Sequence, residues 1–218
     1  MFKVLFQNPS YMGKAIIECV PNISEGRDLE KIHRIVDAAR IDGVKILGIE
    51  PDADYNRTVI TFAGNPQDVE QAAYLLIQSA INEIDMRTHS GEHPRMGCVD
   101  VCPFVPISGA TMEQCAEMAK RVAEKVGELA VPVFLYGGAA SNDSRRSLSV
   151  LRKGEYEHLE QRFAGKSSIH GGPTTLPDYG TSDWVTSVER SGAITIGARD
   201  ILIAYNVNID EIDARISK

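Results

Sequence analysis

The stretch HSGEHPRMG, which begins at His89, places two histidines and a glutamate close together. The spacing of His89, Glu92 and His93 matches a pattern that some zinc peptidases present on one face of a helix. Gly91 inside the pattern and Pro94 directly after it both disfavour a helix. We therefore predict a connecting loop here, in which this arrangement of zinc ligands is disfavoured.

The same loop carries groups suited to acid–base chemistry on an anionic substrate. His93 lies between Glu92 and Arg95, and Asp100 follows a short distance along the chain. An imidazole titrates near neutral pH, so a histidine beside a carboxylate and a guanidinium can act as a general base. On these residues alone the simpler alternative stays open, in which His93 only hydrogen-bonds a turn.

Composition narrows the classes of function. The chain of 218 residues carries a net charge of −7, which argues against a nucleic-acid-binding protein with a basic face. An anionic substrate must then be met by a local group of arginines. No apolar run approaches the roughly 20 residues that span a bilayer, so no membrane segment is expected. The four cysteines include no C-x-x-C pair, and we expect them to be reduced and buried, as in a cytoplasmic protein.

Hydrophobic periodicity predicts alternating strands and helices. The expected helices lie at 28–40, 66–84 and 111–129, with two short ones inside 142–165. Thr111 and Gln114 predict a capping box at the start of the third helix. The expected strands lie at 14–20, 44–50, 57–64, 98–107, 131–138, 193–199 and 201–209. This order indicates a split βαβ pattern, hence an α+β sandwich of ferredoxin-like type with a mixed sheet and helices packed on one face.

Several blocks of the chain are long and unusual enough to compare with known families. In chain order they are ECVPNISEGRD, DYNRTVITFAGNP, IDMRTHSGEHPRMGCVDVCPFVPISGATMEQC, VPVFLYGGAA, LRKGEYEHL, PDYG and GAITIGARDILIAYNVN. Together they closely resemble the formiminotransferase domain of glutamate formimidoyltransferases, which in animals is fused to a cyclodeaminase. The resemblance runs from about residue 16 to residue 209.

The resemblance implies transfer of the formimino group of N-formimino-L-glutamate to N5 of tetrahydrofolate. The products would be 5-formiminotetrahydrofolate and L-glutamate, within histidine degradation and one-carbon metabolism. Tetrahydrofolate would be a co-substrate, and no metal is implied. His93 would be the base that takes the N5 proton and later protonates the leaving glutamate. The resemblance also brings Tyr136 of the LYG segment to the catalytic site, together with Glu50, where many relatives have aspartate.

Other residues are implied in binding formiminoglutamate or folate. Arg57, Arg95 and Arg199 are the expected cations, because a planar guanidinium suits bidentate binding of a carboxylate. Arg145, by contrast, is expected at the surface. The remaining candidates are Asn56, Glu92 and the two glycines that bound a segment similar to a folate-contacting loop, Gly180 and Gly192.

Three parts are expected along the chain. They are an extension over 1–14, the N-terminal subdomain over 15–180, and a linker with the first strand of a truncated C-terminal subdomain over 181–218. Because relatives bind folate between two subdomains, we expect as partner either a homodimer mate or a separate chain that carries the second subdomain. The alternative function is a catalytically impaired relative that binds folate or another anion, or serves in assembly. A metallohydrolase is the third hypothesis.

Overall fold

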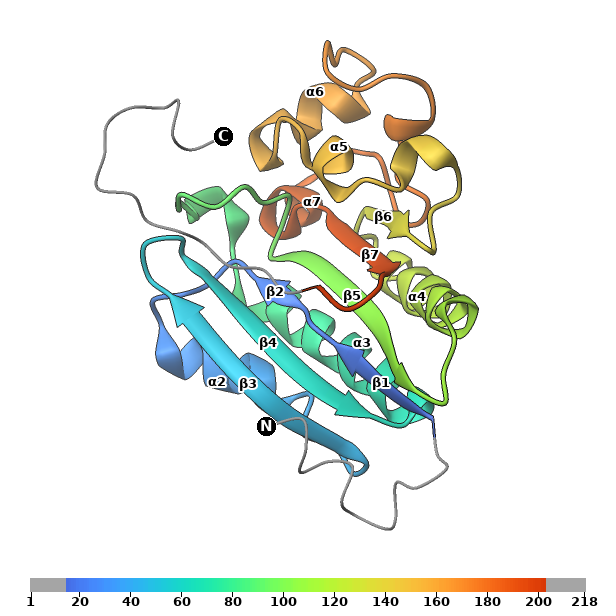
Figure 1. The fold of residues 1–218 in the computed structure, drawn as a ribbon. Coiled ribbons are helices and arrows are strands. Elements are labelled where there is room, and N and C mark those ends of the chain that lie inside the picture. Colours follow the sequence, from blue (N-terminus) through green and yellow to red (C-terminus); the bar gives the residue numbers. More distant parts are fainter. Residues whose placement is uncertain (1–14, 203–218) are drawn as a thin grey trace, which may run out of the picture.

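The computed structural model describes residues 15–202, whose strands form one seven-stranded mixed sheet (Figure 1). The strands are β1 (Ile16–Cys19), β2 (Asn22–Ile23), β3 (Val44–Asp52), β4 (Arg57–Gly64), β5 (Val99–Ser108), β6 (Val133–Gly137) and β7 (Ile194–Ala198). Across the sheet the order is β3, β4, then β1 with β2, then β5, β7 and β6. Pairing is antiparallel from β3 to β5, and β5, β7 and β6 run parallel.

β1 and β2 lie end to end between β4 and β5, and Pro21 separates them. Proline has no N–H to donate to a ladder, which explains the break. Its carbonyl still accepts from the Ile60 N–H at 2.9 Å, and the Val20 N–H donates to the Pro103 carbonyl at 3.2 Å. Neighbouring strands therefore stay joined across the break.

The helices are α2 (Leu29–Asp37), α3 (Pro66–Glu83), α4 (Met112–Gly127), α5 (Leu148–Arg152), α6 (Leu159–Phe163) and α7 (Thr186–Ser191). The three long helices, α2, α3 and α4, begin within one residue of their predicted starts, and α5 and α6 lie inside the predicted range 142–165. The capping box of α4 is confirmed, because the Gln114 N–H donates to Thr111 Oγ1 at 3.3 Å and the Thr111 N–H donates to Gln114 Oε1 at 3.0 Å. The short helix α7 was not anticipated.

Alternate residues of β6 serve two hydrophobic cores. Val133 and Leu135 belong to the large core between the sheet and helices α2, α3 and α4. Phe134 and Tyr136 point to the opposite face and join a smaller core with Leu151 of α5 and residues of α6. The three long helices thus cover one face, as predicted, and α5 and α6 add a layer over part of the other (Figure 1).

Two buried arginines hold the segment 172–178 against the smaller core. Arg162 is 1% exposed, lies 4.0 Å from the centre of the Phe134 ring, and donates to the Thr174 carbonyl at 3.0 Å. Arg145 donates to the Leu176 carbonyl at 2.5 Å and pairs with Asp178. The expectation that Arg145 lies at the surface is therefore wrong, because this segment wraps around its guanidinium.

The α+β fold with a mixed sheet is confirmed. The expected boundary at residue 180 falls before β7, which lies in the same sheet between β5 and β6. The expected strand 201–209 lies outside the described residues except for Ile201 and Leu202, which are exposed and have no regular structure.

The four cysteines are free and buried. Among residues 15–202, no helix is long and apolar enough to cross a membrane.

Candidate active site

The segment from His89 to Gly97 is a loop that leads into β5, as predicted. His89 is held by both ring nitrogens, since Nε2 lies 3.0 Å from the Asn56 carbonyl and Nδ1 accepts from Arg95 Nε at 3.2 Å. Gly91 packs so closely on Tyr55 that a Cβ would lie 2.3 Å from that carbonyl oxygen. The histidines therefore do not share a helix face. Over residues 15–202, no group of three or more His, Cys, Asp or Glu side chains is placed to hold a metal ion.

Arg57, the first residue of β4, joins the loop to the central strands of the sheet. Its Nη1 donates to Nε2 of His93, and its Nη2 donates to Oδ1 of Asn22 on β2. Nδ1 of His93 lies 2.6 Å from the Pro94 carbonyl oxygen, an acceptor only. The proton of the neutral ring therefore lies on Nδ1, and the lone pair on Nε2 faces Arg57.

This environment keeps His93 neutral. Burial, and next the charge of Arg57, lower the pKa of His93 to about 4. An imidazole with so low a pKa is unprotonated at neutral pH, but it is a weak base, because a general base works best with a pKa near the ambient pH. In the same structure, the guanidinium of Arg57 already occupies Nε2 of this imidazole.

Asp100 is the buried carboxylate beneath this pair. Only 1% of its surface is exposed, and its Oδ1 accepts from the Met96 N–H at 3.1 Å. Arg152 of α5 donates to both carboxylate oxygens, at 3.2 and 2.5 Å. Burial raises the pKa of Asp100, while the charges of Arg152 and Arg57 oppose that rise. Asp100 therefore offsets positive charge that would otherwise lie uncompensated beside His93.

Arg95 is buried but already paired. Its guanidinium donates to Glu157 at 2.8 and 2.5 Å and to Glu155 at 3.2 Å. It also lies 6.0 Å from the centre of the Tyr156 ring. These contacts tie the loop to the segment between α5 and α6. Its predicted role in binding a substrate carboxylate stays a prediction. In this structure its contacts hold the loop against Glu155 and Glu157.

One cavity joins the residues of the loop to those of the sheet. It has a volume of about 10 Å³. Its lining residues are Ser24, Tyr55, Asn56, Arg57, His89, His93, Arg95 and Asp100. The structure therefore brings together four of the predicted site residues, Asn56, Arg57, His93 and Arg95.

The sequence analysis missed three residues that complete this cluster. Asn22 and Ser24 come from the block ECVPNISEGRD, and Arg152 comes from LRKGEYEHL. Ser24 Oγ donates to the Gly97 carbonyl at 2.7 Å and so fixes the end of the loop. Membership of those blocks was the available signal, and no local pattern marks these residues.

The other predicted residues lie outside this cavity. Glu50 is exposed on β3 and pairs with Val59 of β4, which in turn pairs with Asn22 of β2. Residues directly opposite each other point to the same side of a sheet, so Glu50 and Asn22 share a sheet face two strands apart. Tyr136 is 4% exposed, and its hydroxyl has no hydrogen-bond partner within residues 15–202. Arg199 donates to the Asp200 carbonyl at 3.0 Å. Glu92 is exposed. The roles of these residues stay predictions.

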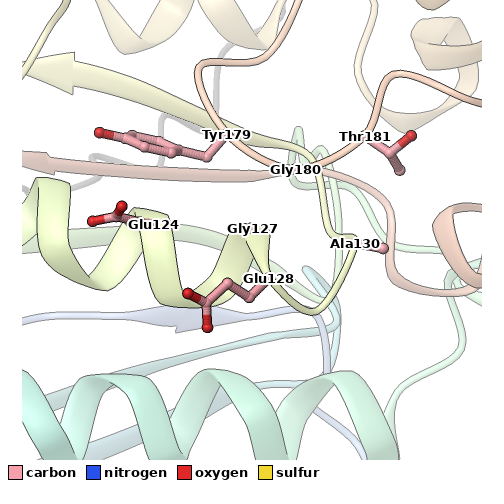
Figure 2. A pocket seen from close by; sticks show the side chains of 7 residues that line it. All are labelled: Glu124, Gly127, Glu128, Ala130, Tyr179, Gly180 and Thr181. Carbon is pink, nitrogen blue, oxygen red and sulfur yellow. The ribbon is translucent and has the colours of Figure 1, made fainter.

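Two glycines that bound the expected folate loop lie in different surroundings. Gly192 is buried and follows α7, where it forms an isolated bridge with Gly97. Gly180 is exposed and lines a second, open depression of about 430 Å³ beside the last turn of α4 (Figure 2). Glu124 and Glu128 line the same depression, and the negative end of α4 adds to their charge. This surface therefore does not favour an anionic ligand, and it shares no lining residue with the cavity at His93.

Comparison with known families bears directly on this arrangement. Residues 16–199 match the family model described as "Formiminotransferase domain, N-terminal subdomain". The chain belongs to the formiminotransferase family. The expectation drawn from the sequence blocks is thereby confirmed, and the matched range includes the whole cavity at His93.

Relatives of this family from distant organisms are similar over most of the chain. A glutamate formimidoyltransferase of Thermoplasma acidophilum is 43% identical over 94% of this chain, and one of Streptococcus pyogenes is 41% identical over 89%. The formimidoyltransferase-cyclodeaminase of Sus scrofa is 43% identical over 89% of this chain. The matched part covers 65%, 62% and 34% of these three relatives, so each extends well beyond it.

Proposed function

We propose that this chain supplies the catalytic base of a glutamate formimidoyltransferase. The reaction transfers the formimino group from N-formimino-L-glutamate to N5 of tetrahydrofolate and releases L-glutamate. Two relatives that carry this activity in their names match about nine-tenths of the chain, which supports the proposal. The observation that carries it is His93, a neutral histidine with an unprotonated Nε2 in a cavity that also holds Arg57.

The bond changes of this reaction require one proton to move. N5 forms a bond to the amidine carbon of formiminoglutamate, and the bond from that carbon to the glutamate nitrogen breaks. N5 loses a proton and the departing nitrogen gains one. Nε2 of His93 can carry that proton, because Nδ1 remains bonded to the Pro94 carbonyl throughout. Arg57 offers an acidic chain the local cation that a substrate carboxylate needs.

We further propose a cytoplasmic setting and a larger assembly. Free, buried cysteines suit a reducing compartment. The relatives extend beyond the matched part, and that remaining length supports a further region, in the same protein or a partner chain, that contributes to the folate site. The proposed transfer of the formimino group from formiminoglutamate to tetrahydrofolate belongs to folate-linked one-carbon metabolism and to the breakdown of histidine.

Replacement of His93 tests the proposal. The variant His93→Ala is expected to lower transfer by about 10²- to 10⁴-fold, the range for a positioned acid–base group. The measurement is release of L-glutamate from formiminoglutamate that depends on added tetrahydrofolate, with circular dichroism to check folding. His33→Ala on α2, an exposed histidine, serves as the matched control and should retain activity.

Two outcomes would contradict the proposal. Turnover near the wild-type value in His93→Ala would remove His93 from the role of base. Absence of transfer by wild-type protein, even when completed with the remaining region of a relative, would favour a catalytically impaired relative that binds folate or another anion.

A further inference from the structure

The guanidinium of Arg57 is shared between two neutral partners, and its Nε–H group has no partner in residues 15–202. Nη1 donates to Nε2 of His93 and Nη2 to Oδ1 of Asn22. The Nε–H group is buried, and none of the residues in 15–202 offers it a hydrogen-bond acceptor. A buried donor without an acceptor costs free energy, so this side chain is poised to gain a better partner. A carboxylate is that partner, since it presents two acceptor oxygens to the guanidinium fork.

The cavity around these groups cannot hold a substrate as it stands. Its volume of about 10 Å³ is close to the space that a single water needs. A molecule that carries an amidine and carboxylates must therefore displace lining side chains. Arg57 spans the cavity from β4 to the loop, so its contact with His93 is among those that must open.

We propose that Arg57 masks the basic nitrogen of His93 and that a substrate carboxylate removes the mask by taking the guanidinium for itself. This inference rests on the proposed function, because it concerns the base and the anionic substrate of that reaction. Arg57 then binds the substrate carboxylate and also acts on catalysis through His93. The base becomes available only when the carboxylate-bearing substrate is in place.

Electrostatics gives the direction of the effect. A guanidinium beside an imidazole disfavours the imidazolium form, and its charge is one reason why the pKa of His93 is lowered to about 4. A carboxylate bound to Arg57 offsets that positive charge, so the pKa of His93 must rise. The other titratable or charged groups that face the cavity are Tyr55, His89, Arg95 and Asp100, with Arg152 behind Asp100.

Those neighbours do not explain the mask. Both nitrogens of His89 are engaged, and Arg95 is paired with Glu155 and Glu157. Asp100 receives its two side-chain hydrogen bonds from Arg152. Arg57 alone among the residues that line the cavity both touches Nε2 of His93 and has a buried donor without an acceptor.

Nuclear magnetic resonance of the histidine side chains tests this directly. Protein labelled with ¹⁵N in histidine is titrated between about pH 3 and 8, with and without saturating L-glutamate, at matched ionic strength. The His93 signals are assigned by their absence in His93→Gln. Without glutamate, His93 is expected as the Nδ1–H tautomer with a pKa near 4. With glutamate, its pKa is expected to rise by about 1–3 pH units.

Variants of Arg57 separate the mask from general effects of the ligand. In Arg57→Gln the pKa of His93 should be raised before glutamate is added, and glutamate should no longer move it. If this variant does not fold, Arg57→Lys keeps the charge and loses the planar fork, so the response to glutamate should weaken. Arg146→Gln removes an exposed guanidinium that pairs with Asp143, and it should leave both pKa values of His93 unchanged.

The outcomes distinguish this inference from the proposed function. If the pKa of His93 stays the same at every glutamate concentration, or is no higher in Arg57→Gln than in the wild type, the mask is overturned. If glutamate raises the pKa but no formimino transfer is detected, even in protein completed with the remaining region of a relative, the mask stands and the proposed function fails. If transfer is present while the pKa of His93 does not respond, the function stands and the mask is overturned.

Discussion

Asp100 is the residue on which the charge balance of the site depends. Its carboxylate is 1% exposed and accepts two hydrogen bonds from Arg152, while Arg57 lines the same cavity. A buried ion pair contributes little net stability, but loss of one partner leaves the other charge buried and uncompensated. A neutral amide in place of this carboxylate would leave two guanidinium groups without a counter-ion.

The change Asp100→Asn is expected to lower the free energy of unfolding by about 3–5 kcal/mol at pH 7, the usual cost of breaking a buried pair. Urea denaturation followed by circular dichroism measures it. Asp143→Asn, which breaks the exposed pair with Arg146, should have little effect. The double variant Asp100→Asn/Arg152→Gln should recover part of the loss. A single variant as stable as wild type would contradict this account of the pair.

Among the structural elements, the close contact between the backbones of Gly97 and Gly192, here called the crossing, sets the position of the loop that carries His93. The two glycines form an isolated antiparallel bridge, and the Ala193 N–H donates to the Met96 carbonyl at 2.9 Å. Gly192 has φ of 65° and ψ of −154°, a region open almost only to glycine. A Cβ there would lie 2.3 Å from the Met96 carbonyl oxygen. The end of α7 and the loop thus fit only without a side chain between them.

Gly192→Ala is therefore expected to destabilise the fold by about 1–3 kcal/mol from backbone strain alone. Because the clash falls three residues after His93, transfer activity should drop further than the loss of folded protein explains. Thermal denaturation and the transfer assay measure the two effects. Gly171→Ala is the matched control, since that glycine has φ of −152° and no atom within 4 Å of the added Cβ. Equal behaviour of the two variants would show that the crossing has no such role.

Local patterns in the sequence predicted most helices and strands, but they did not predict the end of β3 or the short helix α7. The capping residues of α4 and the apolar stripe of α3 are local signals, so both helices were predicted closely. β3 continues across Pro51 to Asp52, which an edge strand tolerates, whereas the sequence analysis ended this strand at residue 50. α7 is short and polar, and Val188 is its one buried apolar residue, so no stripe marks it.

The same distinction holds for the site. Glycine, proline and charged neighbours marked the segment of His93 as a loop with a candidate base, and the family blocks gave His93 that role. Its contact with Arg57 joins residues 36 positions apart, and Arg152 reaches Asp100 from 52 positions away. Hydrophobic periodicity describes which face of an element is buried. It carries no information about which loop lies over which strand, so the family blocks were needed for the remainder.

At the scale of the whole molecule, the small cavity and the longer relatives lead to the same expectation. A cavity of about 10 Å³ buries little of any ligand, whereas pockets gain affinity by covering most of the ligand surface. The matched part covers 65% of the Thermoplasma acidophilum relative. Fusion of the remaining part of that relative to this chain should therefore increase both the affinity for tetrahydrofolate and the rate of transfer.

Calorimetric titration with tetrahydrofolate and the transfer assay, run on the chain alone and on the fusion, measure these two increases. The same fusion with His93→Ala is the control, and it should keep the gain in affinity while losing transfer. If the chain alone already binds and turns over as well as the fusion, the complete site lies within the matched residues.

The place of β7 in the sheet has a consequence for the chain as it is made. β7 begins at Ile194, yet it lies between β5, which ends at Ser108, and β6, which ends at Gly137. A ribosome adds roughly 5–20 residues per second, so β5 and β6 wait on the order of several seconds for the strand that joins them. Throughout that interval the nascent protein presents two unpaired strand edges, which are templates for aggregation. Synthesis of this protein thus passes through a stage at which chaperones that bind nascent chains matter most.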